Sequence, residues 1–185
     1  MMTMTDTLYG PVSRDNLERA GAIRLLVCDV DGVFSDGRIY LGNQGEELKA
    51  FHTRDGFGVK ALQNSGVQVA VITGRRSEIV QTRMTALGVA HIYQGVEDKV
   101  AAYEELKSRL GVSDGQCAYI GDDLVDAPVM ALTGLAVAVA DAHPLLLRQA
   151  HLVTRARGGF GAVRELCDLI MEAQGTLKGA KGMSV

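Results

Sequence analysis

The stretch Val27-Cys28-Asp29-Val30-Asp31-Gly32 decides the fold of this chain. It closes an apolar run over residues 23–30 and ends in two acidic residues and a glycine. A run without strict polar alternation is typical of a strand buried on both faces of a parallel sheet. In open α/β sheets, ligands bind beyond the carboxyl ends of the strands. Asp29 and Asp31 are therefore candidates for a functional site at that edge, although an acidic pair there is also consistent with a structural cap.

Four further apolar runs repeat this pattern, and helix-like segments separate them. The runs cover residues 67–72, 91–93, 117–120 and 135–139. The helix-like segments cover residues 57–63, 76–87, 99–110, 124–132, 144–150 and 161–173. This alternation predicts an α/β fold with a doubly wound parallel sheet.

Residues 34–51 interrupt the alternation. Two extended pieces flank the turn Gly42-Asn43-Gln44-Gly45, which predicts a β-hairpin that projects from the sheet. An isolated hairpin is marginally stable in water, so we expect this one to pack on something. A neighbouring subunit is the first candidate, and packing against its own domain is the alternative. The apolar side chains that favour packing are Ile39, Tyr40, Leu41, Leu48 and Phe51.

Composition narrows the class of protein. The 185 residues suit one domain, which we place at residues 22–174, between a polar extension (1–21) and a tail (175–185). A net charge of −3 argues against nucleic-acid binding, and the sequence has no apolar run long enough to cross a membrane. The three cysteines show neither a zinc nor a disulfide pattern, so we expect a cytoplasmic protein.

Polar residues follow the other runs as well. Thr73-Gly74-Arg75 offers a hydroxyl donor, a close backbone approach and a fork-shaped anion binder, although it also fits a helix cap. Lys99 opens a helix, where its charge opposes the helix dipole and hints at a local anion. Asp122, Asp123 and Asp126 suit a hard cation such as Mg²⁺, or an acidic capping turn.

The chain contains four motifs in the order Asp-x-Asp, Thr, Lys and Gly-Asp-Asp-x-x-Asp. This series resembles the motifs of the haloacid dehalogenase superfamily of phosphatases. The resemblance implies that Asp29 attacks phosphorus and that Asp31 is the general acid and base. It also implies that Thr73 and Lys99 hold the phosphoryl group. Mg²⁺ would be bound by Asp29, Asp122 and the carbonyl oxygen of Asp31, while Asp123 and Asp126 would support the metal or Lys99.

The gaps between these motifs are too short for a cap domain. The chain is thereby similar to the capless members, which form tetramers through a hairpin, so we expect a homotetramer. The hairpin and the C-terminal tail would contact neighbouring subunits, although a disordered tail is the alternative.

Further stretches resemble one family of capless members, the 3-deoxy-D-manno-octulosonate 8-phosphate phosphatases of lipopolysaccharide synthesis. Among them are Gly45–Phe51, Arg54-Asp55-Gly56 and residues 138–144. The implied substrate is a sugar acid phosphate with an anion at each end. The residues implied to contact it, besides Asp31 and Lys99, are His52, Thr53, Arg54, Asp55, Gly56, Lys60, Gly74, Arg75 and Arg83. For Arg83, a solvated helix face is the alternative.

Three other functions remain as alternatives. The first is a capless phosphatase for a nine-carbon sugar acid phosphate. The second is a phospho-accepting receiver domain, in which the paired acids would precede the acceptor. The third is a binding module that has lost turnover, although Asp29, Asp31, Thr73, Lys99 and Asp122 are all in place.

Overall fold

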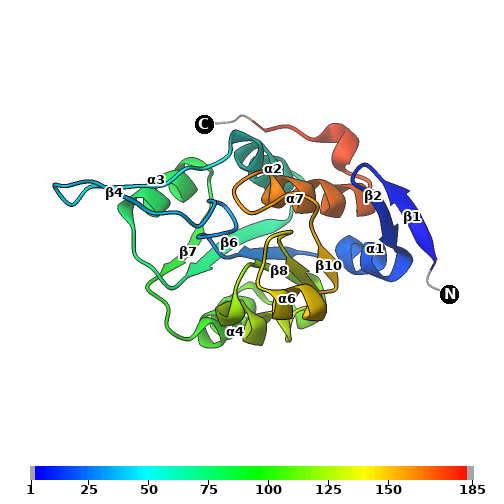
Figure 1. Cartoon of the computed structure of the whole chain (residues 1–185). Helices are drawn as coiled ribbons and strands as arrows, with labels where there is room; N and C mark the ends of the chain where they lie inside the picture. Colours follow the sequence, from blue (N-terminus) through cyan, green and yellow to red (C-terminus); the bar gives the residue numbers. More distant parts are fainter. Residues whose placement is uncertain (1–2, 183–185) are drawn as a thin grey trace.

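The apolar runs form a six-stranded parallel sheet at the centre of the molecule (Figure 1). The computed structural model describes residues 3–182. The strand order is β10-β9-β8-β3-β6-β7, so the first strand of this sheet in the sequence, β3, lies in its middle. This arrangement confirms the prediction of a doubly wound sheet. The strands are β3 (Leu25–Cys28), β6 (Gln68–Thr73), β7 (His91–Gln94), β8 (Cys117–Gly121), β9 (Leu135–Ala138) and β10 (Leu152–Val153).

Helices cover both faces of the sheet (Figure 1). On one face lie α2 (Thr53–Asn64), α3 (Glu78–Ala86) and α7 (Ala162–Ala173). On the other lie α4 (Lys99–Leu110), α5 (Ala127–Met130) and α6 (Pro144–Gln149). The predicted helix over 124–132 is divided, because a 3₁₀ turn (Leu124–Asp126) precedes α5. A second 3₁₀ turn, Asp114–Gln116, leads into β8.

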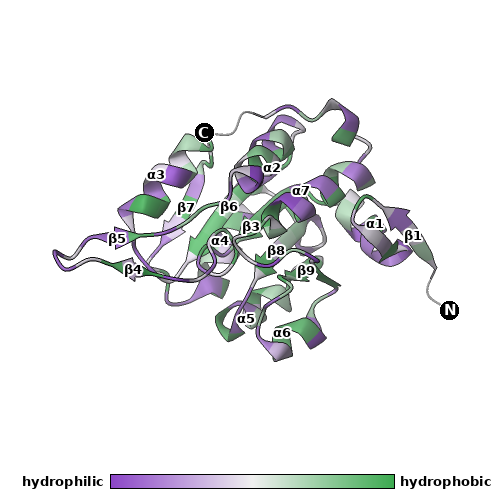
Figure 2. Ribbon diagram, turned by 45° about the horizontal axis from the view of Figure 1, so that its top comes forward, coloured by the Kyte–Doolittle hydropathy of each residue, from purple (hydrophilic) through white to green (hydrophobic). Residues whose placement is uncertain are grey.

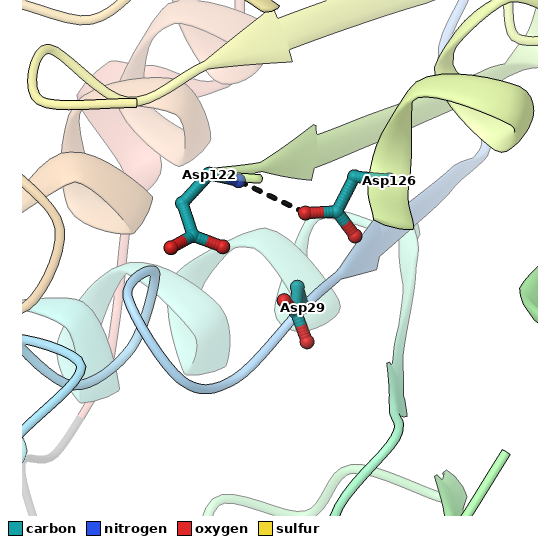
Figure 3. A group of neighbouring side chains, drawn as sticks. All are labelled: Asp29, Asp122 and Asp126. Atoms are coloured by element: carbon teal, nitrogen blue, oxygen red, sulfur yellow. Dashed lines mark hydrogen bonds between the residues drawn. The ribbon is translucent and has the colours of Figure 1, made fainter. Parts of the chain in front are cut away.

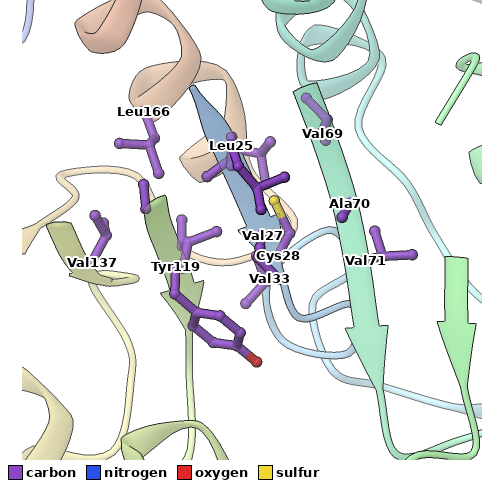
Figure 4. Close-up of a cluster of buried hydrophobic side chains, with 14 of the residues drawn as sticks. Leu25, Val27, Cys28, Val33, Val69, Ala70, Val71, Tyr119, Val137 and Leu166 are labelled. Atoms are coloured by element: carbon purple, nitrogen blue, oxygen red, sulfur yellow. The ribbon is translucent and has the colours of Figure 1, made fainter. Parts of the chain in front are cut away.

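The core lies between the sheet and these helices. All four residues of β3 are buried, as expected for a strand covered on both faces. Side chains from neighbouring strands and from α7 meet there, among them Leu25, Val71, Tyr119 and Leu166 (Figure 4). Figure 2 shows the same pattern, with hydrophobic strands inside and hydrophilic residues toward the outside of the helices. The buried sheet gives the residues at its carboxyl edge a rigid support.

The polar N-terminal segment is folded against the domain. It forms an antiparallel hairpin, β1 (Met4–Thr7) and β2 (Gly10–Ser13), followed by α1 (Arg14–Gly21). The hydroxyl of Tyr9 donates a 2.7 Å hydrogen bond to Asp168 of α7. The sequence predicted no structure here because short, polar elements give no clear hydrophobic period.

The second hairpin projects from the sheet, as predicted (Figures 1 and 2). It consists of β4 (Tyr40–Leu41) and β5 (Glu47–Leu48), which pair antiparallel. Leu41 and Leu48 are 75% and 63% exposed. The hairpin therefore does not pack these leucines against its own domain. Within residues 3–182 the chain adds no cap domain to the sheet and its helices.

The C-terminal tail returns along α2. It contains a 3₁₀ turn, Leu177–Gly179, and Leu177 and Ala180 pack against the core. The side-chain amide of Asn64 donates a 2.7 Å hydrogen bond to the carbonyl oxygen of Lys181. The part of the tail that the structure describes therefore contacts its own chain. Across the described range, none of the helices has the length and apolarity needed to cross a membrane.

Candidate active site

A cleft of about 320 Å³ opens at the carboxyl edge of the sheet. Each predicted motif contributes to it, because β3, β6 and β8 end there and α4 begins there. The lining residues are Asp29, Asp31, Gly37, Thr73, Gly74, Arg75, Val96, Glu97, Lys99, Asp122, Asp123 and Val125. The fold thus brings together residues that lie up to about half the chain apart in sequence.

Asp29 and Lys99 form a buried ion pair at the bottom of the cleft. The ammonium nitrogen of Lys99 lies 3.0 Å from Oδ1 of Asp29 and 2.8 Å from Oδ1 of Asp126. The backbone N–H of Val30 also donates to Oδ1 of Asp29, at 2.7 Å. The ammonium group of Lys99 therefore holds the carboxylates of Asp29 and Asp126 together, and the N–H of Val30 fixes Asp29 further. Oδ2 of Asp29 takes no part in these bonds.

Lys99 keeps its charge although it is buried. Burial lowers its pKa, but the carboxylates of Asp29 and Asp126 raise the pKa overall. Its place at the start of α4 is also explained, since the side chain of Asp98 caps that helix through the N–H groups of Val100 and Ala101. The anion that the sequence indicated near Lys99 is thus supplied by the protein itself.

Three carboxylates meet beside this pair, namely Asp29, Asp122 and Asp126 (Figure 3). One oxygen of each lies within 4.8 Å of the others. Burial and repulsion from Asp29 raise the pKa of Asp122 to about 8, and burial and Asp126 raise the pKa of Asp29. Three carboxylates stand against one ammonium group here, so the cluster has more negative charge than Lys99 offsets. A hard divalent cation would supply the missing positive charge, and carboxylate oxygens are suitable ligands for it.

Asp126 supports this cluster and is already fully bonded. Its Oδ1 accepts hydrogen bonds from Lys99 and from the hydroxyl of Tyr119 at 2.8 and 2.7 Å. Its Oδ2 accepts from the backbone N–H groups of Asp122 and Asp123. Asp122 and Asp29 therefore remain as the carboxylates with unoccupied oxygens. The exposed Asp123 caps the following 3₁₀ turn through the N–H of Leu124.

A glycine allows the two acidic turns to approach each other. Gly32 has φ +84°, a left-handed conformation that other residues rarely adopt. A β-carbon at this position would also collide with the carboxylate of Asp122. The Asp29-Val30-Asp31-Gly32 turn can therefore lie against Asp122 only with glycine at its end.

Thr73, Gly74 and Arg75 form the opposite wall. Thr73 ends β6 and is buried, while Arg75 is half exposed and reaches toward the hairpin. The guanidinium of Arg75 lies 3.3 Å from Glu47 and 3.9 Å from Asp31. This wall presents a hydroxyl and a cation to any anion in the cleft.

Two charged residues of the hairpin contact residues of the cleft, although the sequence did not predict them as site residues. Lys49 donates a hydrogen bond to Oδ1 of Asp31, and Glu47 lies 3.6 Å from the Lys49 ammonium group. The available signal was their spacing, since residues two apart on a strand share a face. Two opposite charges on one face at the base of the hairpin indicate a polar partner.

Comparison with known proteins gives the family. A family model of haloacid dehalogenase-like hydrolases matches residues 86–163. The 3-deoxy-D-manno-octulosonate 8-phosphate phosphatase KdsC of Yersinia pestis is 61% identical over 180 residues, which are 97% of this chain and 96% of that protein. The chain belongs to the KdsC family of haloacid dehalogenase-like hydrolases. A KdsC-family protein is a phosphoric monoester hydrolase, so the chain is an enzyme of that class.

Solved KdsC structures agree with this fold. A crystal structure of the Yersinia pestis phosphatase has a TM-score of 0.98 and 59% identity, covering 100% of both chains. A structure of the Moraxella catarrhalis phosphatase, in complex with a magnesium ion, a phosphate ion and a KDO molecule, has a TM-score of 0.87 and 41% identity. It covers 89% of this chain and 95% of that chain.

Not all residues that the KdsC resemblance implied are in the cleft. Those outside its lining in the single chain are His52, Thr53, Arg54, Asp55, Gly56, Lys60 and Arg83. The helix predicted over residues 57–63 begins earlier, because α2 starts at Thr53 and the ring nitrogen of His52 accepts from the N–H of Arg54. Arg83 of α3 lies next to Gly56, and Lys60 lies beneath the tail, near Gly182. Their contact with substrate stays a prediction.

Asp55 has a structural contact in this KdsC-family chain. It is buried, and its Oδ1 accepts a 2.8 Å hydrogen bond from the backbone N–H of Arg164, in the first turn of α7. Gly161, which precedes α7, has no side chain to cap the helix. Asp55 therefore caps α7 from α2 and joins the two helices.

Proposed function

We propose that the chain is a Mg²⁺-dependent phosphatase that hydrolyses 3-deoxy-D-manno-octulosonate 8-phosphate to 3-deoxy-D-manno-octulosonate and phosphate. The observation that carries the proposal is that one cleft is lined by Asp29, Asp31, Thr73, Lys99 and Asp122. The chain is also 61% identical to a 3-deoxy-D-manno-octulosonate 8-phosphate phosphatase. We place the reaction in the cytoplasm, as a step of lipopolysaccharide synthesis. The three cysteines are free and buried, which agrees with a reducing compartment.

The first step forms an aspartyl phosphate. An oxygen of the Asp29 carboxylate attacks phosphorus, the phosphorus–oxygen bond to the sugar breaks, and the leaving oxygen takes a proton from Asp31. Lys99 and the backbone N–H of Val30 hold Oδ1 of Asp29, so the carboxylate cannot turn away from the substrate. Fixing the attacking group in this way removes part of the entropic cost of the reaction.

The second step releases phosphate. Water attacks phosphorus, its proton passes to Asp31, and the bond between phosphorus and Asp29 breaks, so both carboxyl groups return to their starting states. General acid and base help of this kind contributes roughly 10²–10⁴-fold to a rate.

Positive charge is needed throughout, because carboxylates and a phosphate monoester repel each other. Lys99 and the hydroxyl of Thr73 would bind the phosphoryl oxygens. Asp29, Asp122 and the carbonyl oxygen of Asp31 would hold Mg²⁺, which when bound offsets this repulsion and polarises phosphorus. Arg75, half exposed at the rim, would bind the substrate as a second cation.

We propose further that the active form is a homotetramer assembled through the hairpin and the tail. The exposed Tyr40, Leu41 and Leu48 support an interface at the hairpin. Such an interface would also cover a cleft that no cap domain closes.

The test is phosphate release by the purified enzyme from 3-deoxy-D-manno-octulosonate 8-phosphate, beside a nine-carbon sugar acid phosphate and simple sugar phosphates. Each is assayed with Mg²⁺ and with EDTA. We expect metal-dependent turnover with a strong preference for the eight-carbon substrate. Preference for the nine-carbon acid would contradict the assigned substrate, and no turnover of any phosphate would contradict the proposed function.

A further inference from the structure

The hairpin places a lysine with a buried side chain next to Asp31. The Lys49 side chain is 0% exposed, although the hairpin around it is largely in solvent. Its ammonium group donates a hydrogen bond to Oδ1 of Asp31. Lysine is almost never fully buried unless it is paired, because removing its charge from water is unfavourable. Burial and pairing together show that this side chain is fixed in one position.

Glu47 and Arg75 complete a cluster of four ionisable side chains that includes Asp31 and Lys49. Oε1 of Glu47 lies 3.6 Å from Lys49 and 3.3 Å from Arg75. Arg75 in turn lies 3.9 Å from Oδ2 of Asp31. The cluster sets the carboxyl groups of Asp31 and Glu47 against the two cations Lys49 and Arg75. The base of the hairpin is therefore fastened to the rim of the cleft by paired charges.

The two oxygens of Asp31 have different surroundings in this cluster. Oδ1 is held by Lys49, on the side of the hairpin, whereas Oδ2 is on the side of Arg75, which lines the cleft. A carboxylate that lacks an anchor rotates readily about its terminal torsion, which is broad and two-fold. Lys49 removes that freedom.

We propose that Lys49 is a positioning residue that keeps one oxygen of Asp31 directed at the leaving oxygen of the substrate. The inference rests on the proposed function, in which Asp31 protonates that oxygen. In the first step the bond between Asp29 and phosphorus forms, the bond to the leaving oxygen breaks, and the proton moves from Asp31 to that oxygen. Lys49 itself neither touches the substrate nor exchanges a proton.

This role has a chemical signature. A sugar alkoxide is a poor leaving group and needs the proton, whereas p-nitrophenolate is stable without it. The ratio kcat/KM reports only the steps up to the first irreversible one, here the departure of the leaving group. Misplacing Asp31 should therefore lower kcat/KM for an alkyl phosphate and leave kcat/KM for p-nitrophenyl phosphate nearly unchanged.

The experiment compares Lys49→Met with the wild type on two substrates. These are the sugar acid phosphate, or the alkyl phosphate that the wild type hydrolyses fastest, and p-nitrophenyl phosphate. We expect kcat/KM to fall about tenfold or more for the alkyl phosphate, as loss of an oriented general acid predicts. For the aryl phosphate we expect a much smaller fall. The quotient of the two values cancels any inactive fraction of the preparation.

Three further variants make the test decisive. Lys49→Arg keeps a cation and should restore most of the alkyl activity. Arg38→Met removes an exposed cation of the same hairpin, one paired with Asp36, and should change neither value. Lys49→Gln replaces Lys49→Met if the latter does not fold.

Equal falls for both substrates, or no fall for either, would overturn the positioning role of Lys49. Failure of the proposed function would appear in the wild type instead, as an absence of phosphate release from every substrate.

Discussion

Each acidic residue of the cleft differs in what balances its charge. Asp126 has four donors, and Asp29 has Lys99 and a backbone N–H. Asp122 instead faces other carboxylates, and burial together with repulsion from Asp29 raises its pKa to about 8. The protein therefore leaves one side of the cluster without positive charge. We take this to be the side at which a metal ion and the phosphate bind.

Replacing the nucleophile should end turnover without unfolding the protein. Asp29→Asn keeps the volume of the side chain but removes the charge that attacks phosphorus. We expect phosphate release to fall by at least about a thousandfold, as for other nucleophiles of covalent catalysis. Circular dichroism should be unchanged. Asp15→Asn, at an exposed position of α1, is the matched control, and retained activity in Asp29→Asn would exclude the covalent mechanism.

A second prediction concerns Asp55, whose burial raises its pKa from 3.8 to about 6. Between these values the folded protein binds more protons at this site than the unfolded chain does, so stability falls as pH rises through this window. Asp55→Asn keeps the oxygen that caps α7 but cannot ionise. From about pH 4 to about pH 7.5, the wild type should lose roughly 2–3 kcal/mol relative to the variant.

Urea unfolding of both proteins at the two pH values measures this difference. Titration of the other groups is common to both proteins and cancels. A difference in unfolding free energy that does not change with pH, or that changes in favour of the wild type, would show that Asp55 is not a buried carboxyl group with a raised pKa.

At the residue scale the sequence predicted what lies directly after a strand, and it missed what depends on tertiary contacts. Asp29, Thr73 and Asp122 could be found because parallel strands end at one edge. Lys49 could not, since its contact with Asp31 depends on how the hairpin leaves the sheet. The capping role of Asp55 depends likewise on α2 lying beside α7.

At the scale of elements, the hairpin is a part of the fold that the single chain leaves uncovered. Its base is fixed by Glu47 and Lys49, whereas its outer leucines are exposed. The sequence predicted this element well, because the turn and the apolar residues are local signals. It did not predict β1, β2 and β10, since such short or polar strands carry too little pattern.

Removing the exposed leucines should weaken the assembly. We expect Leu41→Ser/Leu48→Ser to sediment as a smaller species than the wild type, because each leucine buried at an interface contributes about 1.5–3 kcal/mol. Leu8→Ser, which alters an exposed leucine of the N-terminal hairpin, is the control and should sediment like the wild type. If the double variant also sediments like the wild type, the hairpin is not the interface.

At the scale of the whole molecule, both terminal segments pack on the central domain. Tyr9 bonds to α7, and the side-chain amide of Asn64 in α2 donates a 2.7 Å hydrogen bond to the carbonyl oxygen of Lys181. The tail adds Leu177 and Ala180 to the core. The sequence predicted an extension and a tail, because neither segment has the hydrophobic period of a long helix or strand. In the structure the N-terminal segment contacts α7 and the tail contacts α2.

The tail should therefore contribute to stability. Leu177→Ala removes a partly buried side chain, and we expect the free energy of unfolding to fall by about 1–2 kcal/mol. Lys178→Ala alters the exposed neighbour and should leave it unchanged. Urea denaturation of the two variants measures the difference, and equal stability of both would mean that the tail does not pack on α2 in solution.

The most direct test of the account is to trap the phosphorylated enzyme. The wild type is mixed with 3-deoxy-D-manno-octulosonate 8-phosphate and Mg²⁺, quenched in acid within one turnover, digested and examined by mass spectrometry. We predict one phosphoryl group on the peptide that contains Asp29, and none in Asp29→Asn or after addition of EDTA. Phosphate release without any phosphopeptide, or a phosphoryl group on another residue, would contradict the assignment of Asp29 as the nucleophile.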